Sequence, residues 1–109
     1  MKQLSVYCKG VRAGVLIEKY PGRDYSFKYD EDYLKSSLPA ISLTLPKREE
    51  AYESEILFPF FTNLLPEGSN KRYICRKNKI DEEDYFGLLS IMANADFIGA
   101  VDVRRIENE

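Results

Sequence analysis

The densest group of ionisable side chains in the sequence is a short cationic run in its second half. Five cations fall within nine residues: Lys71, Arg72, Arg76, Lys77 and Lys79. Together with Tyr73, which lies among them, such a run can bind phosphate groups, as in RNA, or contact a protein partner. On a helix, Arg72 and Arg76 would lie one turn apart on one face. A third interpretation is a solvated face beside the acidic turn that follows, and the charges alone leave all three open.

The sequence offers few groups for catalysis. It contains no histidine, which removes the commonest general base, the usual nitrogen ligand of zinc and every histidine-based nucleophilic triad. The carboxylate clusters at 30–32 and 81–84 fall in expected turns or helix starts that face water, where no carboxyl group is desolvated enough to act as a general acid. Gly10 and Gly14 lack the Gly-Lys-Ser/Thr that completes a P-loop. We therefore expect no catalytic residues, no metal site and no cofactor.

The charge balance also argues against direct binding to nucleic acid. The 109 residues carry 16 basic and 18 acidic side chains, a net charge of −2, whereas a domain that relies on phosphate contacts is normally basic. No direct nucleic-acid partner is therefore expected. Eight tyrosines and six phenylalanines are more aromatic side chains than a core of this size must hold, and protein interfaces are enriched in tyrosine. The aromatic content favours a protein partner.

Length and cysteine content indicate one domain in a reducing compartment. A chain of 109 residues has the size of one ordinary domain, so 1–109 is expected to be a single unit. Cys8 and Cys75 lie far apart and form no Cys-x-x-Cys, so both are expected to be small buried side chains. No segment is apolar for long enough to be a signal peptide or a membrane span. We expect a cytoplasmic protein without a membrane partner.

The first half of the sequence alternates between apolar and polar residues, which is typical of strands. Three segments show this alternation, 4–8, 25–29 and 41–45, and 13–19 is an apolar run; all four are expected to be strands. Residues 20–23, Tyr-Pro-Gly-Arg, have the chemistry of a tight turn. The segment 30–36 is expected to form a short helical turn, and the charged segment 47–54 a solvated loop.

The second half changes to the spacing of helices. The apolar segment 57–65 is expected to form a short helix with Pro59 near its first turn, where the missing N–H costs nothing. Asp81 is expected to begin the last helix, because the carboxylates at 81–84 favour the positive end of a helix dipole and Asp84 completes a variant of the capping box. The residues that follow have the apolar stripe of a helix packed on a sheet: Tyr85, Leu88, Leu89 and Met92.

The cationic run lies between these two helices. Ser69 can serve as the N-cap of a helix that runs to Lys79 and turns Tyr73 and Ile74 inward. After the helices, the segment 97–103 returns to the pattern of a strand. Strands followed by helices and a returning strand predict an α+β fold. We expect a small antiparallel sheet or partial barrel from the N-terminal half, covered by about three short helices, with the C-terminal strand returning to the sheet.

One string of residues is more specific than these patterns. Residues 59–68 read Pro-Phe-Phe-Thr-Asn-Leu-Leu-Pro-Glu-Gly and resemble the Pro-Phe-Phe-x-x-Leu-Leu-Pro-Glu-Gly signature of the N-terminal region of HipA-type toxin kinases. Four further segments resemble that family in the same order: 14–16, 27–34, 41–46 and 96–101. The resemblance covers nearly the whole chain. Asn94 stands where the family usually has glycine, and asparagine also tolerates the left-handed conformation of a tight turn.

The resemblance implies a function without a kinase active site. In the family, ATP binding and Ser/Thr phosphorylation reside in a larger region that follows this one. Free-standing versions of the segment are the HipS-like component of three-gene toxin–antitoxin modules, in which the small protein restrains a HipA-like kinase, HipT, and a helix-turn-helix protein, HipB, binds operator DNA. The resemblance therefore implies a non-catalytic antitoxin or regulatory subunit that docks on a HipA-like or HipT-like kinase, with a HipB-like protein as a partner through the complex.

The expected contact surface is polar and aromatic rather than apolar. The apolar side chains of the signature are interpreted as core: Phe60, Phe61, Leu64 and Leu65. The expected partner-binding residues lie on the middle helix and in the loop before it: Glu67, Ser69, Arg72, Tyr73 and Arg76. The alternative function is a nucleic-acid-binding accessory, which would use the basic helix to help a helix-turn-helix partner at its operator.

Overall fold

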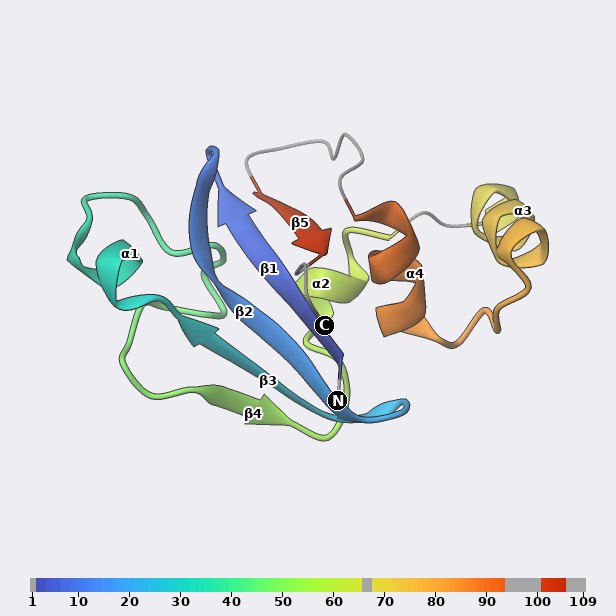
Figure 1. The fold of residues 1–109 in the computed structure, drawn as a ribbon, viewed down its shortest axis with the longest axis horizontal. Coiled ribbons are helices and arrows are strands. Elements are labelled where there is room, and N and C mark those ends of the chain that lie inside the picture. Colours follow the sequence, from blue (N-terminus) through green and yellow to red (C-terminus); the bar gives the residue numbers. More distant parts are fainter. Residues whose placement is uncertain (1, 66–67, 94–100, 106–109) are drawn as a thin grey trace.

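A computed structural model describes residues 2–65, 68–93 and 101–105 of the chain (Figure 1). Within these residues the chain forms a five-stranded antiparallel sheet and four helices, which confirms the predicted α+β class. The elements follow one another as β1 (Lys2–Cys8), β2 (Val11–Tyr20), β3 (Arg23–Tyr29), α1 (Glu31–Lys35), β4 (Tyr52–Ser54), α2 (Pro59–Thr62), α3 (Gly68–Asn78), α4 (Tyr85–Met92) and β5 (Val101–Arg105).

The sheet is built from two consecutive hairpins with one strand added at each edge. Its strand order is β4-β3-β2-β1-β5. Lys9 and Gly10 join β1 to β2 with φ angles of 53° and 82°, which a two-residue turn of type I′ requires. Gly22 has a φ of 73° in the turn to β3, as its Pro-Gly pair predicts. The returning strand β5 pairs with β1, which confirms the predicted return for residues 101–105; residues 97–100 lie outside the described part.

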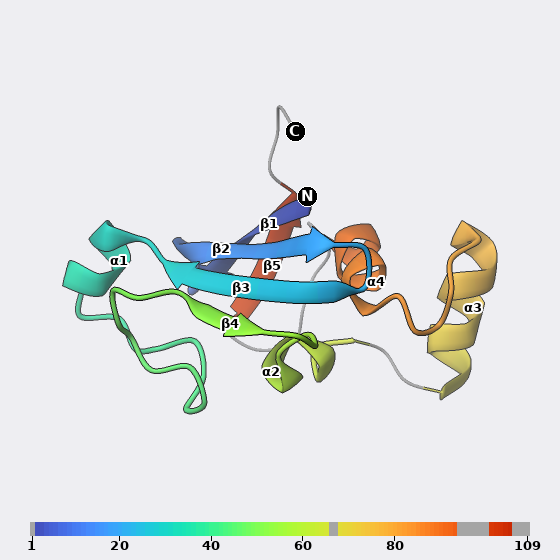
Figure 2. The same cartoon turned by 90° about the horizontal axis from the view of Figure 1, so that it is seen from below.

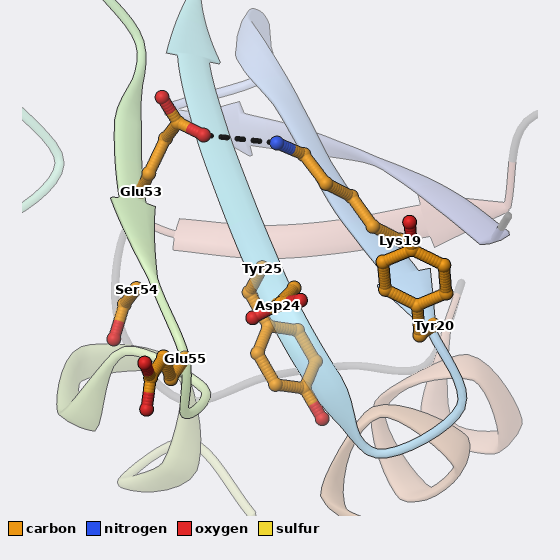
Figure 3. A pocket seen from close by; sticks show the side chains of 7 residues that line it. All are labelled: Lys19, Tyr20, Asp24, Tyr25, Glu53, Ser54 and Glu55. Atoms are coloured by element: carbon orange, nitrogen blue, oxygen red, sulfur yellow. Dashed lines mark hydrogen bonds and ion pairs between the residues drawn. The ribbon is translucent and has the colours of Figure 1, made fainter.

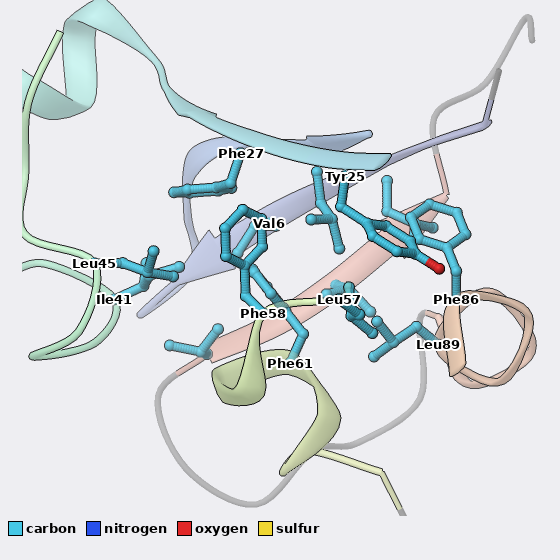
Figure 4. Close-up of a cluster of buried hydrophobic side chains, with 14 of the residues drawn as sticks. Val6, Tyr25, Phe27, Ile41, Leu45, Leu57, Phe58, Phe61, Phe86 and Leu89 are labelled. Carbon is cyan, nitrogen blue, oxygen red and sulfur yellow. The ribbon is translucent and has the colours of Figure 1, made fainter. Parts of the chain in front are cut away.

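The core lies between one face of the sheet and helices α2 and α4 (Figures 2 and 4). The ring of Phe61 on α2 lies 5.8 Å from that of Phe27 on β3, and the ring of Phe86 on α4 lies 6.3 Å from that of Tyr25. All four side chains are buried, and burying a side chain of this size contributes about 2–3 kcal/mol. The two cysteines are buried free thiols, as expected.

The segment 41–45 does not form the predicted strand. The Leu45 N–H donates to the Ser42 carbonyl at 3.1 Å and closes a tight turn, whose only bridge is the Ser42–Leu45 pair. Leu43 at its tip is fully exposed, and the Tyr29 hydroxyl donates to the Leu45 carbonyl from the core. The alternation therefore arises from a turn whose apolar ends enter the core, and a turn can show the same period as a strand.

The charged segment 47–54 contains an edge strand that was expected to be loop. Its last three residues form β4, which pairs with β3 from Phe27–Tyr52 to Tyr25–Ser54. The Tyr52 hydroxyl donates to the Pro46 carbonyl at 2.6 Å, which brings the segment back along the sheet. The surrounding charges mask this short strand in the sequence.

The helices that pack on the sheet agree with expectation in kind but differ in their limits. Helix α1 buries Tyr33, and α2 begins at Pro59 as its position in the first turn predicts. Helix α4 begins at Tyr85 rather than at Asp81. The Asp81 carboxylate accepts the Glu83 N–H at 2.9 Å, which forms a turn before the helix.

The N-cap of α4 is therefore Asp84, whose carboxylate accepts the Gly87 N–H at 3.0 Å. Within the helix, Leu88 and Leu89 are buried as the stripe predicted, and Phe86 rather than Tyr85 is the buried aromatic residue. The core interpretation of the α2 segment is also supported, because its side chains are buried or half-buried: Phe60, Phe61, Leu64 and Leu65.

Candidate protein-interaction surface on α3

Helix α3 lies at one end of the molecule, beside α4 and away from most of the sheet (Figures 1 and 2). It is anchored by a narrow apolar stripe in which Cys75 is buried and Ile74 is half-buried. A Schellman motif ends it: the Ile80 N–H donates to the Cys75 carbonyl at 3.0 Å, and the Lys79 N–H donates to the Arg76 carbonyl at 3.3 Å. Because only the narrow apolar stripe is covered, most of the circumference of α3 is exposed.

Two local expectations for α3 were wrong. Ser69 is not the N-cap, because the helix begins at Gly68 and Ser69 lies inside its first turn. Tyr73 does not point inward and is 64% exposed. Tyr73 lies two positions before Cys75, which places it about 200° around the helix from that buried residue. The predicted inward position of Ile74 agrees with its half-burial.

Four of the five expected partner-binding residues share one exposed face. Arg72 and Tyr73 lie three and four positions after Ser69, and Arg76 lies four and three positions after them, so these side chains are neighbours on the helix surface. We call these four residues the α3 surface. Glu67, the fifth expected residue, lies outside the described part of the chain.

The cations of this helix have no acidic side chains among them. Residues 68–80 contain five cations and no carboxylate. The Lys77 ammonium lies 6.0 Å from the centre of the Tyr73 ring, and the Lys71 ammonium lies 5.1 Å from that of Tyr85. Among residues 2–65, 68–93 and 101–105, no ion pair joins α3 to the acidic turn before α4. The neutralisation expected of a plain solvated face is thus not seen in this part of the structure.

A pocket near the β2–β3 turn is a competing candidate site (Figure 3). Lys19 reaches across β3 and donates to the Glu53 carboxylate at 2.9 Å. This hydrogen bond raises the pKa of Lys19 and lowers the pKa of Glu53, so both groups stay charged at neutral pH. Burial, assisted by the Glu18 carboxylate, raises the pKa of Tyr25 to about 12. These shifts all lead away from the near-neutral pKa that suits proton transfer.

Two other kinds of feature are absent from the described residues. Within them, no cluster of three or more metal-ligating side chains could hold an ion. No helix in this part of the chain is long and apolar enough to cross a membrane.

One group of cations was not predicted from the sequence. Four basic side chains gather around a hollow beside α1: Lys28, Lys35, Lys47 and Arg48. They come from three separate segments, so no spacing along the chain could have predicted the group.

Two of the comparisons with known proteins name the same domain. The model of the HipA N-terminal domain matches residues 4–104. An uncharacterized protein of Haemophilus influenzae is 33% identical over 99 residues, which cover 91% of this chain and 88% of that protein. A solved structure described as the N-terminal domain of HipA toxin matches with a TM-score of 0.75 and 28% identity, over 100% of this chain and 96% of that one.

Proposed function

Because this chain belongs to the HipA N-terminal domain family, we propose that it is a non-catalytic antitoxin or regulatory subunit that docks on a HipA-like Ser/Thr kinase and restrains it. The similar solved domain is described as part of a HipA toxin. A domain at the N-terminus of such a toxin has the rest of the toxin as its neighbour. Membership of this family therefore supports a HipA-like kinase as the binding partner.

The α3 surface is the observation that carries the proposal. A helix held by one narrow stripe presents two arginines and a tyrosine that is 64% exposed. Arginine and tyrosine are, with tryptophan, the side chains enriched at the energetic centres of protein interfaces. None of the three forms an ion pair within the described residues, so a partner would not have to break one to bind them. Glu67 remains part of the proposed contact on sequence grounds.

The proposal extends to a complex in the cytoplasm. A HipB-like DNA-binding protein would join through the kinase rather than through this chain. The net charge of −2 agrees with an indirect association with DNA, since direct binding favours a basic domain.

Co-expression with the HipA-like kinase encoded nearest to this chain tests the proposal. We expect a tagged chain to recover the kinase and to relieve the growth arrest that the kinase causes alone. A variant that combines Arg72→Ala with Arg76→Ala should lose recovery and relief. Lys2→Ala, which removes an exposed cation on β1, is the matched control and should keep both. Absence of a complex with the unmodified chain, together with unrelieved growth arrest, would refute the proposal.

Helix α3, which contains several cations and no carboxylate, also favours a second candidate function, a nucleic-acid-binding accessory at an operator. A gel shift at several salt concentrations separates the two functions. If α3 binds phosphates, the combined Arg72→Ala and Arg76→Ala variant should make the negative slope of log affinity against log salt shallower, by about 0.9 per lost contact. Binding that ignores both salt and these substitutions would exclude the accessory function.

A further inference from the structure

Helix α1 lies at the end of the molecule opposite α3 (Figure 1), and charged side chains line a hollow beside it. The hollow encloses about 680 Å³ between α1, β3 and the loop that leads to β4. Four cations and two carboxylates line it, with one apolar side chain: Lys28, Glu31, Leu34, Lys35, Lys47, Arg48 and Glu49. The lining therefore carries a formal charge of +2.

Lys47 is fixed in place by neutral groups. Its ammonium donates to the carbonyls of Ser36 and Leu38, both at 2.9 Å. The same ammonium lies 5.1 Å from the centre of the Tyr33 ring. These contacts use two of its three N–H donors and order the side chain without neutralising its charge.

Arg48 is held in the same manner. Its guanidinium donates to the carbonyls of Glu50 and Ala51 at 3.2 and 3.1 Å. It also lies 3.7 Å from the centre of the Tyr52 ring, within the range of a cation–π contact. Several of its five N–H donors remain available for a ligand.

The two other cations are also without a counter-ion in the described chain. Lys28 donates to the backbone carbonyl of Glu49, and Lys35 is exposed on α1 without a hydrogen bond to a described residue. Some cations elsewhere on the sheet, by contrast, are paired with carboxylates. Arg12 lies 3.0 Å from the Asp30 carboxylate, and further pairs join Lys19 to Glu53 and Arg104 to Asp102.

We propose that this hollow, which we call the α1 pocket, binds a phosphate monoester. Two cations ordered by carbonyls and aromatic rings, and two more beside them, offer several N–H donors and a +2 field to a dianion with three acceptor oxygens. A carboxylate ligand would use only half of that charge. Glu31 and Glu49 line the same space and would repel the phosphate. Their carboxylates can instead accept hydrogen bonds from other groups of the ligand.

The monoester could be carried by a phosphorylated serine or threonine or by a nucleotide. Both present the same phosphate chemistry to the pocket. The α1 pocket shares no residue with the α3 surface, so this inference stands or falls separately from the proposed docking on a kinase.

Amide chemical shifts of the full chain test the proposal during titration with O-phosphoserine, AMP and unmodified serine. We expect both phosphate monoesters to shift amides in 28–35 and 47–49, and serine to leave them unchanged. Tighter binding of O-phosphoserine would assign the pocket to phosphorylated side chains, and tighter binding of AMP to nucleotides. Equal shifts with serine, or no localised shifts with either phosphate probe, would overturn the proposal.

Two substitutions of opposite sign sharpen this test. Lys35→Gln should weaken binding of the phosphate probe about fivefold, the factor for one charge pair at contact distance in water. Glu49→Gln removes an opposing charge and should strengthen binding by a similar factor. Lys77→Gln, the same change on α3, is the control and should have no effect. Equal weakening by Lys35→Gln and Lys77→Gln would show nonspecific attraction and would refute a site at the α1 pocket.

Discussion

Replacing Tyr29 by phenylalanine removes one hydroxyl that holds two ends of a turn in the core. Tyr29 is 2% exposed. Its hydroxyl donates to the Leu45 carbonyl and accepts the Ile41 N–H at 3.1 Å. Burial raises the pKa of Tyr29, so the hydroxyl keeps its proton and can donate at neutral pH. The variant retains the aromatic ring and its packing but leaves both backbone groups without this partner.

The expected loss of stability follows from those two groups. A buried donor or acceptor without a partner costs about 1–3 kcal/mol. Because the turn can relax and admit water to one of the two groups, we expect Tyr29→Phe to lower the free energy of unfolding by about 1–3 kcal/mol in total. That is a large share of the 5–15 kcal/mol or so that stabilises an ordinary domain.

Urea unfolding followed by circular dichroism at pH 7 measures this loss. Tyr73→Phe removes a hydroxyl from a side chain that is 64% exposed, so this control should change the free energy of unfolding by no more than about 0.5 kcal/mol. If Tyr29→Phe also changed it by less than about 1 kcal/mol, with an unchanged urea dependence, the hydroxyl would not hold the turn. The account of residues 41–45 as a turn anchored by Tyr29 would then be wrong.

Three further outcomes are expected from the same structure. The pKa of Tyr25 rises from its ordinary 10.0 to about 12, so the folded state retains this proton more strongly than the unfolded state. The contribution of Tyr25 to the free energy of unfolding should therefore be fully present below pH 10 and fall by about 2–3 kcal/mol between pH 10 and 12. Urea unfolding across that range should show this fall in the unmodified chain and a smaller fall in Tyr25→Phe. Asp84→Ala removes the N-cap of α4 and should cost about 1 kcal/mol, whereas Asp84→Asn should restore most of it; equal losses in the two variants would argue against capping. Gly14→Ala would place a Cβ 2.2 Å from the Lys28 carbonyl oxygen and should lower the free energy of unfolding by about 3 kcal/mol or more, a prediction that an unchanged urea midpoint would contradict.

The strands that were predicted correctly have patterns that depend only on neighbours in the sequence. Period-two alternation, an apolar run and a Pro-Gly turn are local signals, and they located β1, β2 and β3. The alternation at 41–45 failed because its apolar ends are held by the Tyr29 hydroxyl, which lies 12 residues from Ile41. The short strand β4 exists because β3 offers it an edge to pair with, and nothing within the charged segment itself indicates that edge.

The candidate site shows the same division between local and distant causes. The cations of α3 and their helical spacing were readable from the sequence. The outward direction of Tyr73 was not, because it depends on Cys75 being the residue that anchors the helix. The α1 pocket could not be predicted from the sequence for a related reason. Its cations come from β3, α1 and the loop before β4, which meet only in the folded chain.

The affinity of the α3 surface for a HipA-like kinase tests the central claim most directly. Isothermal titration calorimetry would give the dissociation constant of the unmodified chain, of Lys2→Ala and of the single variants Arg72→Ala, Tyr73→Ala and Arg76→Ala. The account predicts binding by the first two, and at least a tenfold loss, or about 1.4 kcal/mol, for each α3 variant. Kinase binding that is unaffected by all three α3 substitutions would contradict it.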